Sequence, residues 1–168
     1  WNTFIEERTE KTPKHVVSFS KSSQAHKAVL IQEVQKNEES RIALQDFELN
    51  RVLGGGIVPG SLILIGGEPG IGKSTLALQI VMNLNTIKSL YISGEESAQQ
   101  IRLRAERLGD FSKSECLIHT ETQLETILNI TNQEKPGLLL IDSIQTLHSE
   151  HIESSPGSVS QVRHCAAE

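Results

Sequence analysis

Short apolar runs alternate with amphipathic segments along the chain from residue 41 onward. An uninterrupted apolar run at residues 62–65 is typical of a strand buried on both faces of a sheet. After a glycine-rich stretch, apolar residues recur at helical spacing between Leu76 and Leu84, which predicts an amphipathic helix. Because this alternation continues as far as Asp142, we expect an α/β fold with a mostly parallel sheet flanked by helices.

The later elements carry comparable signals. Further strands are predicted at residues 90–92, 117–119 and 138–142. Each of the two intervening helices is predicted to begin with a capping box: Ser97 with Gln100, and Thr122 with Glu125.

The first 40 residues differ in composition from the rest. They are rich in Lys, Ser, Gln, Thr and Glu and poor in large apolar side chains, which favours a linker. We therefore place a boundary near residue 40, with one domain over residues 41–168. The chain begins at Trp1 rather than at Met, so we expect it to be a piece of a longer polypeptide.

Composition and charge exclude several classes of protein. The sequence has no apolar run of about 18 residues, so we expect no membrane span. Cys116 and Cys165 are far apart and form no CxxC pair, which fits a reducing compartment and predicts a cytoplasmic protein. A formal net charge of −5 excludes a uniformly basic coat, although a local basic stripe can still bind nucleic acid.

One motif matches the phosphate-binding pattern G-x-x-x-x-G-K-[ST], and it lies between a predicted strand and a predicted helix. Its residues are Gly67, Glu68, Pro69, Gly70, Ile71, Gly72, Lys73 and Ser74. The glycines let successive backbone N–H groups point at phosphate oxygens. Lys73 is then expected at the β- and γ-phosphates, the Ser74 hydroxyl at Mg²⁺ and Thr75 near the α-phosphate. The competing interpretation is a glycine-rich turn with an incidental lysine.

Acidic residues follow two of the predicted strands. Asp142 ends an apolar run at the carboxyl edge of the sheet, where ligands of parallel α/β folds bind, and it is a candidate for the Mg²⁺ shell. Glu95 or Glu96 could polarise the water that attacks the γ-phosphate, and we favour Glu95. As alternatives, Asp142 caps a turn and the glutamates complement a helix dipole.

Three arginines, Arg102, Arg104 and Arg107, fall on one predicted helix. They could contact DNA phosphates or the nucleotide of a neighbouring subunit. A solvated helix face is the interpretation that we favour.

Four further stretches form an ordered series with the phosphate-binding motif. They read LGGGIVPGS at residues 53–61, YISGEES at 91–97, IDSIQT at 141–146 and PGSVSQVR at 156–163. Together they closely resemble the bacterial RadA (Sms) family of DNA repair proteins over roughly residues 41–168. Even WNT at residues 1–3 resembles the segment that follows that family's four-cysteine zinc finger.

The resemblance implies a RecA-like P-loop ATPase core that acts with ATP and Mg²⁺ in homologous recombination and in processing branched DNA. It implies a homohexameric ring around single-stranded or branched DNA, with ATP between subunits and a recombinase as a possible partner. By motif, Lys73 and Ser74 would bind phosphates and Mg²⁺, Asp142 would be the Walker B acid, and Glu95 would activate water. Ser143 would begin a segment that leads toward the DNA-contacting elements.

The sequence departs from the family pattern in few places. Asn50 stands where the family has Asp, and His164 where it has Glu. The zinc finger, the KNRFG motif and the carboxyl-terminal Lon-like domain lie outside these residues, and zinc is expected only in that finger. Few residues follow Asp142, so we expect the core to be truncated after the Walker B strand and residues 1–168 alone to hydrolyse ATP weakly.

Two other interpretations stay open. One is a different RecA-like ATPase, KaiC-like or helicase-like, which shares the Gly-Glu-Glu turn. The other is a nucleotide-binding assembly module without useful turnover. The stretches at residues 53–61 and 156–163 favour the RadA family over the first.

Overall fold

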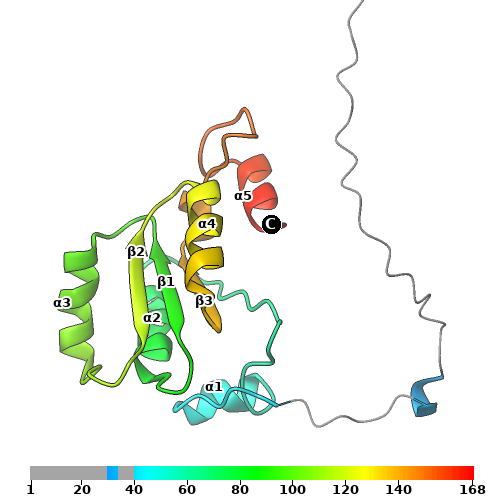
Figure 1. Cartoon of the computed structure of the whole chain (residues 1–168), viewed down its shortest axis with the longest axis vertical. Helices are drawn as coiled ribbons and strands as arrows, with labels where there is room; N and C mark the ends of the chain where they lie inside the picture. Colours follow the sequence, from blue (N-terminus) through cyan, green and yellow to red (C-terminus); the bar gives the residue numbers. More distant parts are fainter. Residues whose placement is uncertain (1–29, 34–39) are drawn as a thin grey trace, which may run out of the picture. The chain divides into compact units, whose positions relative to one another are not determined.

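The computed structural model describes residues 30–33 and 40–168 (Figure 1). Most of the predicted linker over residues 1–40 therefore lies outside the described residues. The chain divides after Asn37 into two units. In the first, Ile31–Glu33 forms a single 3-10 turn, η1. In the second, the described residues form the α/β fold that follows.

Three parallel strands make the sheet, in the order β2-β1-β3. Their bounds are β1 Ser89–Ser93, β2 Cys116–Thr120 and β3 Leu138–Asp142. Every residue of the central strand β1 is buried, including the serines at its two ends. In the register, Ser93 is opposite Thr120 on one side and Asp142 on the other. The carboxyl ends of all three strands therefore meet at one edge of the sheet.

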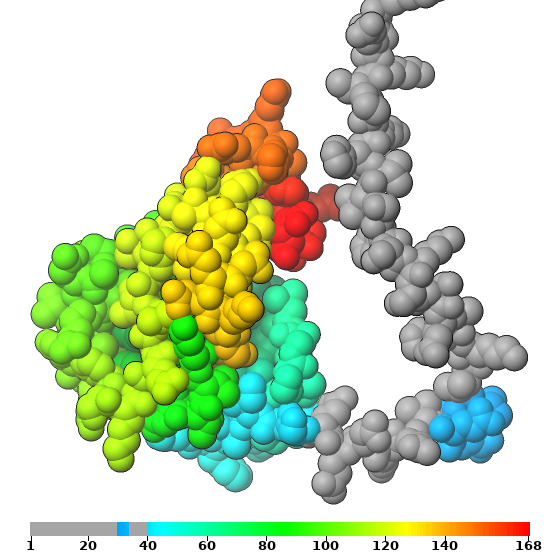
Figure 2. Space-filling model, in the orientation of Figure 1, coloured from blue at the N-terminus to red at the C-terminus, as the bar shows by residue number. Residues whose placement is uncertain are grey.

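Helices cover both faces of the sheet (Figure 1). On one face, α2 (Lys73–Asn83) and α3 (Ala98–Leu108) pack on Tyr91 of β1. On the other face, α4 (Leu124–Glu134) and α5 (Val159–Cys165) pack on Leu90 and Ile92. Helices α4, in yellow, and α5, in red, lie side by side there (Figure 2). The predicted α/β class with a parallel sheet is confirmed.

A third, smaller cluster lies at the amino-terminal end of this unit, where α1 (Phe47–Val52) is found. The Asn50 amide binds the backbone of Leu44 twice: its Oδ1 accepts from the N–H at 2.9 Å, and its Nδ2 donates to the carbonyl at 2.6 Å. An aspartate could make only the first of these bonds, because it has no N–H to donate.

One of the two predicted capping boxes is confirmed. Ser97 caps α3, with reciprocal hydrogen bonds to Gln100. The box of Thr122 with Glu125 is wrong, because α4 begins one residue later than that pairing requires, with Gln123 as its N-cap. Glu125 is instead engaged by Ser149, whose hydroxyl donates to it at 2.6 Å. A distant partner thus overrides the local pattern.

The predicted strand at residues 62–65 is also wrong. The chain there forms no strand, and Leu62 and Leu64 are 89% and 84% exposed. A strand needs a hydrogen-bonded neighbour, and no other segment of residues 40–168 pairs with this one. Apolar composition can predict β propensity, but it cannot supply that neighbour.

Within the described ranges, no helix has the length and apolar character that a membrane span requires.

Candidate nucleotide-binding site

The glycine-rich motif lies directly before α2. Gly72 is the N-cap residue of α2 and has φ +96°, and Gly70 has φ +81°, a region of backbone conformation that favours glycine. The Lys73 ammonium donates to the carbonyl oxygens of Gly67 and Glu68, at 2.9 and 2.7 Å. The loop therefore curls around the lysine head group.

The rest of the motif is close to the start of the helix. Ser74 and Thr75 lie in the first turn of α2, where backbone N–H groups have no partner within the helix. Ile71 is 63% exposed, and Pro69 and Gly70 are exposed beside it. The open loop and the positive end of the helix dipole together suit an anion.

Two oxygen-bearing side chains meet beside this loop. The Ser74 hydroxyl donates to Oδ1 of Asp142 at 3.0 Å, across 68 positions of sequence. A hydroxyl and a carboxylate are hard oxygen donors, which Mg²⁺ prefers as ligands. The remaining coordination positions of Mg²⁺ are usually filled by water and phosphate oxygens. The residues present therefore fit a nucleotide-bound Mg²⁺ ion.

The second oxygen of Asp142 has a partner of its own. The Tyr91 hydroxyl donates to Oδ2 of Asp142 at 2.6 Å from the middle of β1. Burial raises the pKa of Tyr91 far above its ordinary value, and the bond to Asp142 raises that pKa further, so the phenol stays protonated. Both oxygens of the carboxylate are thus held by hydroxyl groups.

The two candidate glutamates after β1 have different surroundings. Glu95 is exposed, and its Oε1 accepts from the Ser143 hydroxyl at 2.9 Å. Glu96 forms a hydrogen-bonded ion pair with Arg104, and each of these two side chains is only about a quarter exposed. The positive charge of Arg104 therefore pairs with the Glu96 carboxylate, whereas the Glu95 carboxylate remains open toward solvent.

The turns after β1 and β3 are tied together. The Gly94 N–H donates to the Asp142 carbonyl at 3.1 Å. A Cβ on Gly94 would overlap the Thr146 hydroxyl of η2 (Ile144–Thr146), so only glycine permits this approach. Helices α3 and α4 leave the neighbouring strands β1 and β2 toward opposite faces, so a topological switch point lies between β1 and β2 at this same edge.

Sequence reasoning missed part of this constellation. Tyr91 was assigned only to a strand, yet a buried tyrosine requires a partner for its hydroxyl, and that requirement was a usable signal. The solvated-face interpretation holds for Arg102 and Arg107, which are exposed, but it is wrong for Arg104. Helical spacing offers a signal here, because Arg104 is three residues after Ile101 and four before Leu108, beside the buried face of α3. Its partner Glu96, in the preceding turn, could not be read from that spacing.

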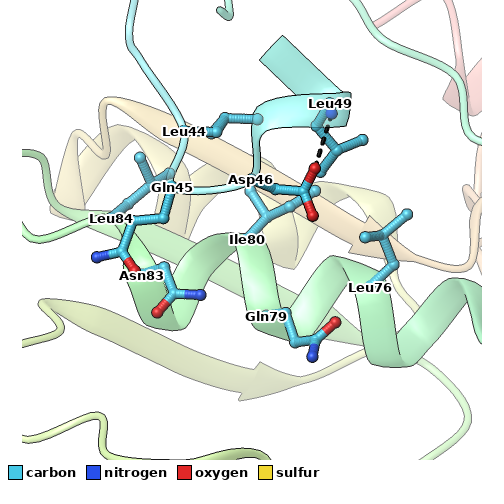
Figure 3. A pocket seen from close by; sticks show the side chains of 9 residues that line it. All are labelled: Leu44, Gln45, Asp46, Leu49, Leu76, Gln79, Ile80, Asn83 and Leu84. Carbon is cyan, nitrogen blue, oxygen red and sulfur yellow. Dashed lines mark hydrogen bonds between the residues drawn. The ribbon is translucent and has the colours of Figure 1, made fainter. Parts of the chain in front are cut away.

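A separate pocket lies along α2 (Figure 3). Leu44, Asp46 and Leu49 line one side of it, and Leu76, Ile80 and Leu84 line the other. The Asp46 carboxylate is already engaged in capping α1, where it accepts from the Leu49 N–H at 2.8 Å. None of the phosphate-loop residues, Glu95 or Asp142 lines this pocket, so it is distinct from the site described above.

The chain is similar to known proteins over its whole length. It is 48% identical over 172 aligned residues to the DNA repair protein RadA of Bacillus subtilis (strain 168), an alignment that covers all of this chain and 37% of that protein. It is 44% identical to the DNA repair protein RadA of Pseudomonas aeruginosa (strain PAO1), over 99% of this chain and 37% of that protein. The chain corresponds to a fragment of the ATPase region of RadA proteins.

The chain spans a little over a third of the length of these RadA relatives, at 37%. A third RadA protein, from Listeria monocytogenes serovar 1/2a, is 46% identical over 99% of the chain. Residues 46–116 match the family model described as "ATPase: KaiC". This match begins at Asp46 and includes the phosphate loop and Glu95. The three-stranded parallel sheet and its helices therefore correspond to a fragment of a RecA-like P-loop ATPase domain.

Proposed function

We propose that this chain binds ATP with Mg²⁺ and that the full-length protein hydrolyses ATP in response to DNA. The pairing of Ser74 with Asp142 at 3.0 Å, beside the phosphate loop, carries this proposal. The energy of ATP hydrolysis drives the processing of single-stranded or branched DNA in homologous recombination and repair. The name that the RadA relatives share, DNA repair protein, supports this role.

The phosphate loop binds the nucleotide. Its backbone N–H groups and the start of α2 attract the phosphates, from Gly67 to Thr75, with Thr75 near the α-phosphate. Lys73 exchanges its two carbonyl partners for β- and γ-phosphate oxygens, a stronger pairing because the new partners are charged. This exchange requires only movement of a flexible side chain.

Ser74 and Asp142 would hold Mg²⁺, with Ser74 as a direct ligand and Asp142 acting through water. When bound, Mg²⁺ neutralises charge that develops on the β- and γ-phosphate oxygens. The two side chains orient that shell from two elements, the start of α2 and the end of β3.

Glu95 orients and polarises the attacking water. Its open carboxylate and its contact with Ser143 support this assignment, because the contact holds one oxygen and leaves the other for water. The ion pair with Arg104 makes Glu96 the poorer base.

We further propose how the chain is organised in the full-length protein. Residues 41–168 are the amino-terminal part of the ATPase domain, and residues 1–40 link it to a preceding zinc finger. The protein forms a cytoplasmic homohexamer that works beside a recombinase. Zinc content and the molar mass from light scattering of the full-length protein test these points; a zinc-free monomer would contradict both.

The experiment is steady-state ATP hydrolysis by the full-length protein, with and without single-stranded DNA. Lys73→Ala is expected to lose ATP binding. Glu95→Gln should retain binding and lose hydrolysis by about 100-fold or more, the usual contribution of a positioned base. DNA should stimulate the parent protein and leave Glu95→Gln unchanged.

Two matched variants sharpen this test. Glu96→Gln removes the neighbouring carboxylate, and Glu106→Gln removes an exposed one on α3 that pairs with Arg102. Normal hydrolysis by Glu95→Gln together with loss in Glu96→Gln would reverse the assignment. Tight ATP binding by the parent without turnover or DNA response would favour an assembly module. Turnover by residues 1–168 alone is expected to be weak.

A further inference from the structure

Tyr91 is a polar side chain in the most buried part of the fold. It is only 1% exposed, and its ring packs against Leu78 of α2 and Ile101 of α3. In the sheet it is opposite Leu140, so Asp142, two residues further along β3, projects from the same face. The hydroxyl reaches Oδ2 of Asp142 at 2.6 Å from this fixed position.

The geometry at Asp142 gives each carboxylate oxygen one hydroxyl partner. Ser74 binds Oδ1 and must release or share it when it turns toward a metal ion. Tyr91 binds Oδ2 from the rigid centre of the sheet and has no such second task. The bond from Tyr91 therefore remains to set the orientation of the carboxylate once Ser74 engages Mg²⁺.

We propose that Tyr91 is a positioning residue for the Mg²⁺ shell, because it holds the Asp142 carboxylate in the orientation that receives the metal-bound water. This inference rests on the proposed ATP and Mg²⁺ site. Groups that orient metal-binding side chains through hydrogen bonds typically change metal affinity by 10- to 100-fold when they are removed.

The test is Tyr91→Phe in the full-length protein, which removes one hydroxyl and retains the ring that packs against α2. Binding of a fluorescent, non-hydrolysable ATP analogue is titrated with Mg²⁺, and binding is measured separately in EDTA. We expect the Mg²⁺ concentration at half-saturation to rise about tenfold. Affinity for the analogue in EDTA should stay unchanged, because Tyr91 is not part of the phosphate loop.

A second readout separates the effect on Mg²⁺ from a general loss of stability in the variant. The gain in melting temperature on adding Mg²⁺ to the analogue-bound protein is a difference within one variant, so a lower baseline does not affect it. This gain should shrink in Tyr91→Phe. Thr131→Val is the matched control: it removes a hydroxyl that donates to the Ile127 carbonyl at 2.8 Å within α4, and it should leave both readouts unchanged.

The outcomes separate this inference from the proposed function. If the parent protein shows no Mg²⁺-dependent binding of the analogue, the proposed function fails and the inference fails with it. A normal parent with an unshifted Tyr91→Phe variant overturns the inference alone. Equal shifts in Tyr91→Phe and Thr131→Val also overturn it, since the hydroxyl would then act only through general stability.

Discussion

At the scale of single residues, the site depends on a few hydroxyl groups that hold carboxylates. Ser74 and Tyr91 hold Asp142, and Ser143 holds Glu95. A hydroxyl–carboxylate bond restricts side-chain rotation without neutralising the charge, so the carboxylate stays available for water or metal. Only Ser74 among these hydroxyl groups belongs to a motif that specifies its chemistry in advance.

Ser143→Ala tests this arrangement at Glu95. Loss of the 2.9 Å bond frees the Glu95 carboxylate to rotate, so the hydrolysis rate should fall about tenfold. This loss is smaller than the loss expected when the base itself is removed. ATP binding should be unchanged, because the bond is outside the phosphate loop. Stopped-flow nucleotide binding and steady-state turnover measure the two effects. The control is Ser112→Ala, which removes an exposed hydroxyl that is bonded to Asp110. Full turnover by Ser143→Ala would contradict the prediction.

At the scale of elements, the turns that follow β1 and β3 work as one unit. They are joined by the bond from the Gly94 N–H to the Asp142 carbonyl and by the close approach of Thr146. The end of β2 and the beginning of α4 are connected differently, through the Glu121 carboxylate. Its Oε1 accepts from the Thr122 and Gln123 N–H groups at 2.7 and 2.9 Å. Each junction can be tested separately.

Gly94→Ala should destabilise the fold by about 1–3 kcal/mol, the usual range for inserting a methyl group into a packed position. The cost should be smaller in a Thr146→Ala background, where the overlapping hydroxyl is absent. Urea unfolding of the four proteins in the cycle measures this coupling. Gly66→Ala is the control, since a Cβ there meets no atom within 4 Å. Equal costs in both backgrounds would contradict the predicted overlap.

The junction at Glu121 predicts a pH dependence. Backbone N–H groups of Gln123 and Thr122 hold the pKa of Glu121 below its ordinary value of 4.5. A lowered folded-state pKa adds stability at neutral pH, and this stability is lost as pH falls below about 4.5 through the folded pKa. The parent should therefore exceed Glu121→Gln in unfolding free energy at pH 7 and lose that advantage in acid. A difference in unfolding free energy that grows as the pH falls would contradict the prediction.

At the scale of the whole molecule, the apolar segment at residues 62–65 has a composition that does not match its exposed environment. Leu62 and Leu64 are almost fully exposed in a segment that no other described strand pairs with. Exposed extended apolar segments promote strand pairing between chains. The 168-residue chain should therefore self-associate through this segment.

The double variant Leu62→Thr with Leu64→Thr should reduce concentration-dependent association of the 168-residue chain. Its melting temperature should stay close to that of the parent, because neither leucine is buried. Size-exclusion chromatography with light scattering measures the association. Leu103→Thr, a single exposed leucine on α3, is the matched control and should associate like the parent. Unchanged association in the double variant would contradict the prediction.

Local signals in the sequence determined much of this protein. The apolar runs at β1, β2 and β3 and the Ser97 capping box depend on neighbours in the chain, so they could be predicted from it. The glycine-rich turn before α2 could also be predicted, because its positive φ angles at Gly70 and Gly72 favour glycine.

Tertiary structure decided what depends on distant partners. Residues 62–65 have the composition of a strand but no neighbour to pair with, and Glu125 binds Ser149 instead of capping its own helix. The contact of Tyr91 with Asp142 spans 51 positions of sequence, and only the sheet register brings the two side chains together. Pairing across such separations is set by how strands align in space, and no local pattern of residues encodes that alignment.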